Sequence, residues 1–295
     1  MNEAAPAYGQ PTPTMVQSAP PALPDKSLIY RTKLPVRLWH WTNAITIFIM
    51  LMSGMMIFNA HPHLYWGAFG ANPDHQWLSI GHRGTSGFLR LGSTEFNTTG
   101  LLGYAGGVGM PFPPVLTIPS SYSLADARLW HFFFAWMLVV PGLLFALWAL
   151  VTRHLTRDIL PKLKELSPGH LWHDIKDHAR LRFPTGEEAR HYNVLQKIAY
   201  CAVLFVLLPG IVLTGLTMSP YMDAAWPWLL WVFGGRQSAR SIHFLCATGL
   251  AGFIFVHLAA VVAAGPINEI RSIITGWYRL PQPRMPKTAK LETGK

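Results

Sequence analysis

A chain of 295 residues that is 51% hydrophobic and 13% charged, with 12 Trp and 16 Phe, does not have the composition of a soluble globular domain. The formal net charge of +10 would suit a nucleic-acid-binding protein, but no basic–aromatic cluster or nucleic-acid-binding motif accompanies it. The composition instead indicates an integral membrane protein of the all-α class.

Four apolar segments, each about 20 residues long, qualify as membrane-spanning helices. In chain order they are 36–58, 129–151, 198–218 and 242–264. We therefore expect a four-helix transmembrane bundle within residues 34–280. We expect a Pro- and Ala-rich disordered tail over residues 1–33 and a loose basic tail over residues 281–295.

Lys and Arg residues alternate between rich and poor segments along the chain. There are four up to Arg37, three in 59–128, nine in 152–197, two in 219–240 and six after 264. This alternation follows the positive-inside rule, with both termini and the middle segment in the cytoplasm. It predicts a multi-pass protein of the bacterial inner membrane whose 59–128 loop is periplasmic. The excess positive charge then sets the orientation of the spans in the membrane and attracts anionic lipid headgroups.

The segments between the spans carry further patterns. The 59–128 loop is rich in Gly, Pro and aromatic residues, and a loop of this length usually has a function or some structure of its own. Apolar residues at helical spacing in 152–197 and 268–278 predict short amphipathic helices on the membrane surface. The histidines of the long loop are His61, His63, His75 and His82. They could ligate a metal or only form hydrogen bonds, and their spacing fits no strong metal-site pattern.

His243 and His257 lie fourteen residues apart in the fourth apolar segment. At about 100° per residue, this spacing brings both imidazoles to within roughly 40° of one helix face and about 21 Å apart along the axis. One histidine therefore lies towards each side of a hydrocarbon layer about 30 Å thick. Ionisable residues inside a span are candidates for functional sites, and two at this spacing suggest ligands of two stacked haem irons.

The predicted topology places four intramembrane histidines in two layers. His131 and His243 lie near the periplasmic ends of their spans, whereas His40 and His257 lie near the cytoplasmic ends. Bis-histidine ligation needs two imidazoles that approach one iron from opposite sides. The sequence therefore predicts an outer haem b between His131 and His243 and an inner haem b between His40 and His257. The alternative is that each histidine forms a hydrogen bond across a helix pair.

Residues near these histidines extend the predicted site. Gly54 lies fourteen residues after His40, at the depth of the outer haem, where it would let the macrocycle approach the backbone or serve ordinary helix packing. Arg37, Arg128 and Arg240 each stand three residues before one of the histidines. Each is a candidate partner for a haem propionate, and each would also be expected as a basic residue flanking a span.

Several motifs resemble those of bacterial cytochrome b561-type membrane subunits. That group includes the cytochrome b subunits of nickel–iron hydrogenases and formate dehydrogenases, and the branch named for the thiosulfate reductase cytochrome b subunit is the most similar. The motifs are Arg37–Leu–Trp–His40, Arg128–Leu–Trp–His131, Tyr192–Asn–Val–Leu–Gln–Lys197, Leu213–Thr–Gly–Leu–Thr–Met–Ser–Pro220 and Gly234–Gly–Arg–Gln–Ser–Ala–Arg–Ser–Ile–His243, with His257. The resemblance covers about residues 34–276 and implies two b haems ligated from the first, second and fourth spans.

The resemblance also implies a quinone site beside the inner haem. In the formate dehydrogenase relatives, an Asn-x-x-Gln segment that opens a membrane helix contacts the quinone, and the matching positions here are Asn193 and Gln196. Lys197 or His191 could lie on the route that brings protons to the quinone. The alternative is that Asn193 and Gln196 only begin the helix as a cap and first turn.

The predicted function is the passage of single electrons between the quinone pool and a periplasmic redox partner. The long periplasmic loop favours a molybdenum-cofactor oxidoreductase as that partner, so the chain would be an electron-transfer subunit. One alternative is a stand-alone quinone-linked oxidoreductase whose outer haem reacts directly with a small oxidant such as superoxide. Another is a non-redox membrane protein, such as a transition-metal transporter, which would be colourless.

Overall fold

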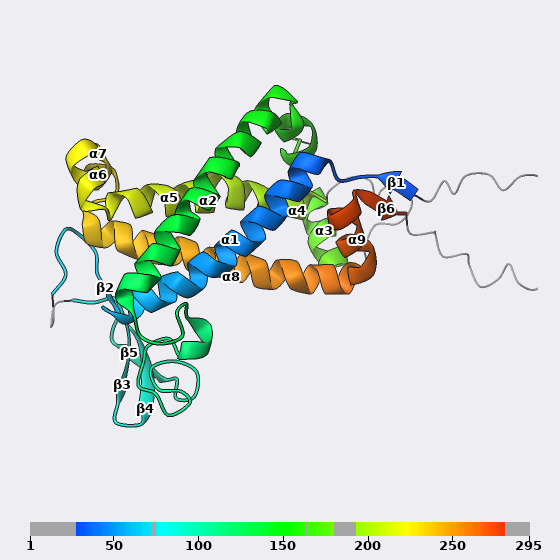
Figure 1. The fold of residues 1–295 in the computed structure, drawn as a ribbon. Coiled ribbons are helices and arrows are strands. Elements are labelled where there is room, and N and C mark those ends of the chain that lie inside the picture. Colours follow the sequence, from blue (N-terminus) through cyan, green and yellow to red (C-terminus); the bar gives the residue numbers. More distant parts are fainter. Residues whose placement is uncertain (1–27, 72–74, 163, 180–192, 281–295) are drawn as a thin grey trace, which may run out of the picture.

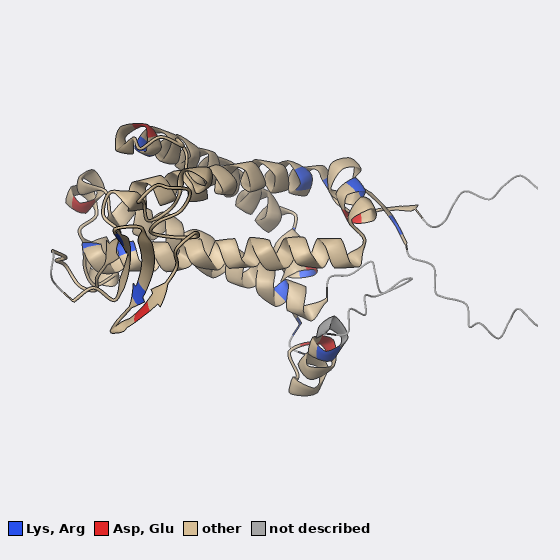
Figure 2. Ribbon diagram, turned by 90° about the horizontal axis from the view of Figure 1, so that it is seen from below, with Lys and Arg blue, Asp and Glu red and all other residues tan. Residues whose placement is uncertain are grey.

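The fold is mostly helical, and the computed structural model describes residues 28–71, 75–162, 164–179 and 193–280 (Figure 1). Four helical segments are long and apolar enough to cross a membrane: α1 (Leu34–Asn59), α2 (Leu124–Val151), Val194–Thr217 and α8 (Arg236–Ala264). Each coincides with one predicted span, so the expected four-helix membrane bundle is confirmed. Charged residues lie at the ends of these helices and leave the middle of each free of charge (Figure 2).

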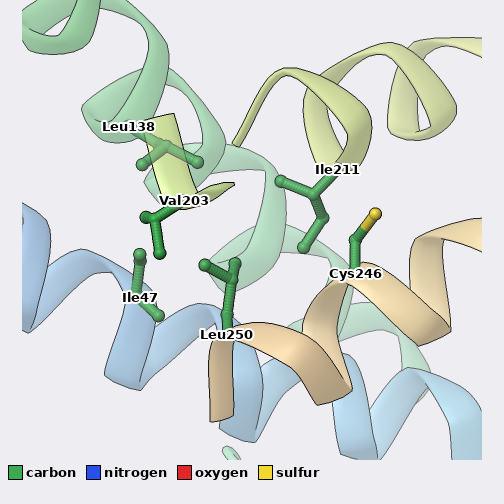
Figure 3. Packing of buried hydrophobic residues seen from close by; sticks show 6 residues of the cluster. All are labelled: Ile47, Leu138, Val203, Ile211, Cys246 and Leu250. Atoms are coloured by element: carbon green, nitrogen blue, oxygen red, sulfur yellow. The ribbon is translucent and has the colours of Figure 1, made fainter. Parts of the chain in front are cut away.

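The spans form two antiparallel hairpins. α1 packs along α2, and the third span packs along α8 through α5 (Leu208–Thr217). In Figure 1 the α1–α2 hairpin crosses the α5–α8 hairpin. One buried apolar cluster joins all four spans (Figure 3) and consists of Ile47, Leu138, Val203, Ile211, Cys246 and Leu250. Close packing of this kind is what holds helices together in a membrane, where lipid is as apolar as the side chains.

The third span is not one continuous α-helix. It comprises α4 (Val194–Ala202), the π-helical segment η4 (Val203–Leu207) and α5. Pro209 follows the π-helical segment, and its missing N–H removes one hydrogen bond of the α-helical pattern. Gly210 then allows a close approach to α8, because a Cβ built there would lie 3.0 Å from Sγ of Cys246.

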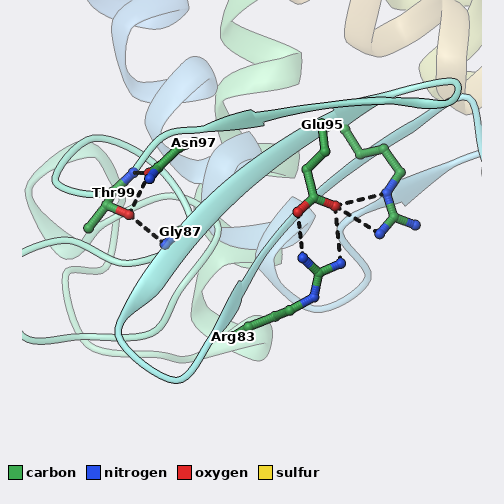
Figure 4. Close-up of polar contacts among 6 residues, drawn as sticks. Arg83, Gly87, Glu95, Asn97 and Thr99 are labelled. Atoms are coloured by element: carbon green, nitrogen blue, oxygen red, sulfur yellow. Dashed lines mark hydrogen bonds and ion pairs between the residues drawn. The ribbon is translucent and has the colours of Figure 1, made fainter.

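The segment between the first two spans contains an antiparallel sheet of four strands, which the all-α prediction did not include. The strands in sheet order are β2 (His63–Leu64), β3 (Leu78–Arg83), β4 (Ser86–Leu91) and β5 (Thr94–Asn97). Two-residue turns that begin at Gly84 and Gly92 connect the last three strands. Their φ angles of +57° and +56° lie in the region that glycine enters without steric cost. On the sheet, Glu95 forms ion pairs with Arg83 and Arg90 (Figure 4).

The sheet packs against the ends of α1 and α8, and we call this end of the bundle the loop side. Its buried cluster consists of Phe58, Leu64, Leu78 and Ile80, with Phe244 packed against it. The indole N–H of Trp77 donates to Oγ of Ser241 (2.9 Å), and that hydroxyl donates to the carbonyl of Tyr65 (2.6 Å). The long loop is therefore folded onto the bundle next to the start of α8.

The opposite end, which we call the tail side, joins the two ends of the described chain. β1 (Leu28–Tyr30) pairs antiparallel with β6 (Trp277–Arg279), so part of the predicted disordered tail forms a strand. The surface helix predicted over 268–278 is α9 (Pro266–Thr275), which ends before β6. The hydroxyls of Thr32 and Ser272 form a buried hydrogen bond of 2.9 Å between these segments.

The segment after α2 contains a π-helical turn, η2 (Leu155–Ile159), and the amphipathic helix α3 (Pro168–Ala179). This agrees with the prediction of surface helices between the second and third spans. Residues 1–27 and 281–295, which include most of the two predicted tails, lie outside the described residues.

Candidate functional site

The structure brings the four intramembrane histidines together in two pairs. The ring centroids of His131 on α2 and His243 on α8 are 6.2 Å apart, with the ring planes at 56°. Those of His40 on α1 and His257 on α8 are 6.3 Å apart, with the planes at 55°. A metal ion between two imidazoles, with bonds of about 2 Å to each nitrogen, would place the ring centroids about 6 Å apart. Both pairs therefore have the spacing of a shared axial ligand set.

An apolar layer separates the outer pair, His131–His243, from the inner pair, His40–His257. Ile47, Leu138 and Leu250 each lie seven residues along their helix from a histidine of the pairs, or about 10 Å in depth. These three residues pack together in the cluster of Figure 3. The pairs are thus two separate sites at two depths, and an apolar layer of this kind does not suit a path for a hydrated metal ion.

Hydroxyl groups from neighbouring helices hold both histidines of the outer pair. Nδ1 of His131 lies 3.1 Å from Oγ of Ser53 on α1, and Nδ1 of His243 lies 3.1 Å from Oγ1 of Thr214 on α5. Ser53 and Thr214 are fully buried. The sequence prediction missed both, because the available signal is only a hydroxyl residue followed by a glycine within an apolar span.

Each of these hydroxyl residues is followed by a glycine that lies against the same imidazole. A Cβ built on Gly54 would lie 3.4 Å from Cε1 of His131, and one built on Gly215 would lie 3.4 Å from Cε1 of His243. Gly54 therefore lies at the outer pair, at the depth that its spacing predicts. Its role in admitting a macrocycle stays a prediction. Gly215 was not among the predicted site residues.

The inner pair has different surroundings. Within the described residues, three buried polar atoms along the start of α1 have no hydrogen-bond partner: Nε of Arg37, Nδ1 of His40 and Oδ1 of Asn43. Phe253 stacks on the ring of His257, with centroids 5.7 Å apart and planes at 17°. Buried polar groups normally have partners, so this side of the inner pair fits a bound group with polar substituents.

The three arginines predicted to bind haem propionates lie in different settings. Arg37 donates to a backbone carbonyl in the last turn of α9. Arg240 donates to the backbone carbonyls of His61 and His63, and so fastens the long loop to α8. Arg128 is exposed near the start of α2. Propionate binding stays a prediction for all three, and Arg240 has a structural role that the sequence did not reveal.

The histidines of the long loop form no cluster of three or more metal-binding side chains within the described residues. Nδ1 of His63 lies 2.9 Å from Oγ of Ser79, and Nδ1 of His82 lies 3.1 Å from a backbone carbonyl. Burial and the nearby Arg240 guanidinium lower the pKa of His61 and of His63, which favours the uncharged form of both rings. His63 and His82 thus follow the hydrogen-bonding alternative.

Asn193 and Gln196, the predicted quinone residues, form a capping box at the start of α4. Oδ1 of Asn193 accepts from the backbone N–H of Leu195 (2.8 Å), and Oε1 of Gln196 accepts from the backbone N–H of Asn193 (3.3 Å). The capping contacts are therefore present, and the quinone role stays a prediction. The cap uses the two amide oxygens and none of the amide N–H groups, which are the donors that a quinone carbonyl requires.

Lys197, the third predicted quinone residue, is buried and ion-paired. Its ammonium group donates to both carboxylate oxygens of Glu165, at 3.1 and 2.9 Å. This contact lowers the pKa of the Glu165 carboxyl. The pair links the segment after α2 to the start of the third span. His191, the other predicted proton-route residue, lies outside the described residues.

Known proteins share this sequence pattern over most of the chain. A protein of Azospira oryzae named as a protein-methionine-sulfoxide reductase subunit is 30% identical over 138 residues, 47% of this chain and 66% of the relative. The chain thus spans just under two thirds of that relative's length. A protein of Azotobacter vinelandii named as a Ni/Fe-hydrogenase B-type cytochrome subunit is 21% identical over 267 residues, 85% of this chain and 89% of the relative.

No solved structure matches the chain. The sequence model of the family described as prokaryotic cytochrome b561 matches residues 31–276, a range that includes all four spans and both histidine pairs. The resemblance predicted from the sequence motifs is thereby confirmed at the level of the family, and this chain belongs to the prokaryotic cytochrome b561 family.

Proposed function

We propose that this chain is a di-haem b-type cytochrome subunit that passes electrons between the quinone pool and a redox partner on the opposite side of the membrane. His131 and His243 ligate the outer haem b, and His40 and His257 ligate the inner haem b. The observation that carries the proposal is that two pairs of imidazoles face each other at two depths of one membrane bundle. The ring centroids are 6.2 Å apart in the outer pair and 6.3 Å apart in the inner pair. Bound haem supplies reversible one-electron chemistry.

The protein's own contribution is ligation, spacing and the exclusion of water. Two histidines fourteen residues apart on α8 lie about 21 Å apart in depth, which is most of a hydrocarbon layer of about 30 Å. The layer formed by Ile47, Leu138 and Leu250 keeps the space between the two sites apolar. The unpartnered Nε of Arg37 at the inner pair supports a propionate contact there, because a buried guanidinium N–H needs an acceptor.

We assign the tail side to the cytoplasm and the loop side to the periplasm of the bacterial inner membrane. The segments that end on the tail side hold four, nine and six Lys or Arg residues, whereas those on the loop side hold three and two. Basic residues are retained on the cytoplasmic side during insertion. The quinone would then exchange its protons with the cytoplasm.

The quinone site lies at Asn193 and Gln196. Both residues open the third span on the tail side, the same side as the inner pair His40–His257. Their amide N–H groups are not used by the capping box, so each can donate to a quinone carbonyl. The buried ion pair of Lys197 with Glu165 places titratable groups beside this helix start.

The redox partner docks on the loop side. Trp66 and Phe69, on the segment between β2 and β3, have exposed fractions of 53% and 87%. Trp66 stacks on Trp77 (5.7 Å between centroids), which is bonded to Ser241, two residues before His243. An exposed aromatic surface is typical of a docking site, and this one is continuous with the helix of the outer pair. A molybdenum-cofactor oxidoreductase is the partner class that we propose, and the relatives named above are themselves subunits of oxidoreductases.

The first test is the haem content of the purified chain in detergent. We expect two equivalents of haem b per chain and reduction of both by a short-chain quinol. A matched control is His170→Ala, which removes an exposed histidine of α3 and should leave both equivalents bound. One equivalent, or none, in correctly folded protein would contradict the proposal.

A stand-alone oxidoreductase is distinguished by the same preparation. If the reduced chain transfers its electrons rapidly to superoxide without any added protein, the outer site acts directly on a small oxidant. We expect slow reaction, since the sheet packs over Phe58 and Phe244 at the loop-side ends of α1 and α8.

A further inference from the structure

The two hydroxyls of the outer pair determine which nitrogen of each imidazole carries its hydrogen. Oγ of Ser53 lies 2.8 Å from the carbonyl of Ile49, and Oγ1 of Thr214 lies 2.6 Å from the carbonyl of Gly210. A carbonyl can only accept, and a hydroxyl has one hydrogen to donate. Each hydroxyl therefore donates its hydrogen to a backbone carbonyl of its own helix.

A second carbonyl of the same helix also lies near each hydroxyl, that of Met50 at 3.2 Å from Ser53 and that of Ile211 at 3.3 Å from Thr214. The contact of each hydroxyl with a histidine must then be an accepted hydrogen bond. The Nδ1 atoms of His131 and His243, each 3.1 Å from its hydroxyl, must be the donors. Nδ1 carries the hydrogen in both rings, and Nε2 is left as the lone-pair nitrogen. An imidazole can ligate a metal only through such a nitrogen.

The same arrangement occurs once in each hairpin. Ser53 of α1 holds a histidine of α2, and Thr214 of α5 holds a histidine of α8, so each hydroxyl comes from the hairpin partner of the helix that it serves. The residue after the hydroxyl is Gly54 in one case and Gly215 in the other. A Cβ built on either glycine would lie 3.4 Å from Cε1 of the ring that the hydroxyl contacts. A hydroxyl–glycine dipeptide thus contacts each of the two histidines of the outer pair, once from α1 and once from α5.

We propose that Ser53–Gly54 and Thr214–Gly215 are two copies of one ligand-positioning unit that fixes the tautomer and orientation of the outer histidines. In the inner pair, no such unit holds His40 of α1, because its Nδ1 is buried without a partner among the described residues. The proposal rests on haem ligation by the two pairs. It assigns Ser53 and Thr214 as positioning residues that act through His131 and His243.

A hydrogen bond from Nδ1–H makes the imidazole a stronger electron donor and orients it towards the metal. Loss of the acceptor should therefore raise the midpoint potential of the outer haem, since the oxidised iron is stabilised less. It should also weaken retention of the outer haem by about ten-fold or more. The inner haem should keep its potential, and it serves as an internal measure of correct folding.

The experiment compares Ser53→Ala, Thr214→Val and the double variant with the wild-type chain in detergent. Potentiometric titration of the alpha bands and low-temperature electron paramagnetic resonance would follow each haem separately. Thr217→Val is the matched control, because Thr217 is equally buried one turn later on α5 and donates to a carbonyl of its own helix, that of Leu213. Ser53→Thr and Thr214→Ser keep a hydroxyl and should restore the wild-type potential and spectrum.

The expected result is a shift of one haem signal in each single variant, a larger shift in the double variant and none in the Thr217 control. If both haems bind and the double variant matches the Thr217 control in potential and spectrum, the positioning role is wrong while the proposed function stands. If the wild-type chain binds no haem at the outer pair, the proposed function fails first.

Discussion

The outer and inner histidine pairs have nearly the same geometry but differ in the hydrogen bonds that their rings form. Their centroid separations are 6.2 and 6.3 Å and their interplanar angles 56° and 55°. In the outer pair, Ser53 and Thr214 bind the rings of both histidines. In the inner pair, Nδ1 of His40 has no partner among the described residues. The two pairs thus reach the same separation although a ring of the inner pair lacks such a hydrogen bond, whereas the tautomer and orientation of an imidazole need separate contacts.

The surroundings of the pairs differ in a second way. On the loop side, the segment that contains the sheet is hydrogen-bonded to the start of α8 through Ser241 and Arg240. The tail side joins the start of α1 to the end of α9 through the side chains of Thr32, Arg37 and Trp41. The rings of the outer pair are therefore held by the neighbouring helices α1 and α5. The start of α1, which carries His40, is tied to α9, so we expect the inner pair to depend on these tail-side contacts.

The largest expected effect comes from removing the proposed haem ligands of the outer pair. His131→Ala and His243→Ala should each lose about one equivalent of haem and leave the same residual spectrum. Haem quantification and reduced-minus-oxidised spectra would measure both. Different residual spectra in the two variants would show that these histidines do not share one haem.

Removing the inner pair should give the complementary result. His40→Ala and His257→Ala should keep the outer haem and lose reduction by quinol, because in the proposed function the inner site accepts electrons from the quinone. Stopped-flow reduction by a short-chain quinol is the measurement. Fast quinol reduction in either variant would separate the quinone site from the inner pair.

Asn193 allows the capping and quinone roles to be separated. Asn193→Ser keeps a side-chain oxygen for the helix cap and removes the amide donor, whereas Asn193→Ala removes both. If the amide binds the quinone, both variants should slow quinol oxidation by about ten-fold, the effect of one lost hydrogen bond. Only the alanine variant should also lose about 1 kcal/mol of stability. Normal turnover in Asn193→Ser would leave Asn193 as a cap alone.

The buried ion pair beside α4 should affect stability more than turnover. Glu165→Gln removes the counter-charge of the buried Lys197 and should cost about 1–3 kcal/mol. The lowered pKa of Glu165 means that its stabilising effect is present above the pKa of an unfolded Glu, about 4.3, and is lost as the pH falls through the lower folded value. Thermal unfolding in detergent should therefore show a difference at pH 7 that shrinks in acid.

The smallest expected effect comes from a tail-side variant and tests whether the tail-side contacts affect the inner pair alone. Thr32→Val breaks the buried bond to Ser272 on the tail side and should cost about 1 kcal/mol. It should speed dissociation of the inner haem and leave the outer one unchanged. Thr117→Val, which changes a buried threonine on the loop side, is the matched control. Equal loss of both haems from Thr32→Val would contradict the dependence of the inner pair on the tail-side contacts.

The spans and the pairing of histidines by depth could be predicted because both follow from local periodicity. Apolar runs of about 20 residues and a fourteen-residue spacing are readable along one helix. The sheet was missed although Gly84 and Gly92 begin two-residue turns, because its strands are short and give little periodic signal. The pairing of Leu28–Tyr30 with Trp277–Arg279 joins segments from opposite ends of the chain. No local pattern contains that pairing.

By itself, the sequence determined a membrane bundle of four helices with two histidines at each of two depths, since hydropathy and helical repeat are properties of single segments. Only the tertiary structure decided which side chains meet the rings of those histidines. Ser53 and Thr214 contact the outer pair because each hairpin sets the rotation of one helix against its neighbour. That rotation depends on packing along the whole hairpin, which no spacing within one helix specifies.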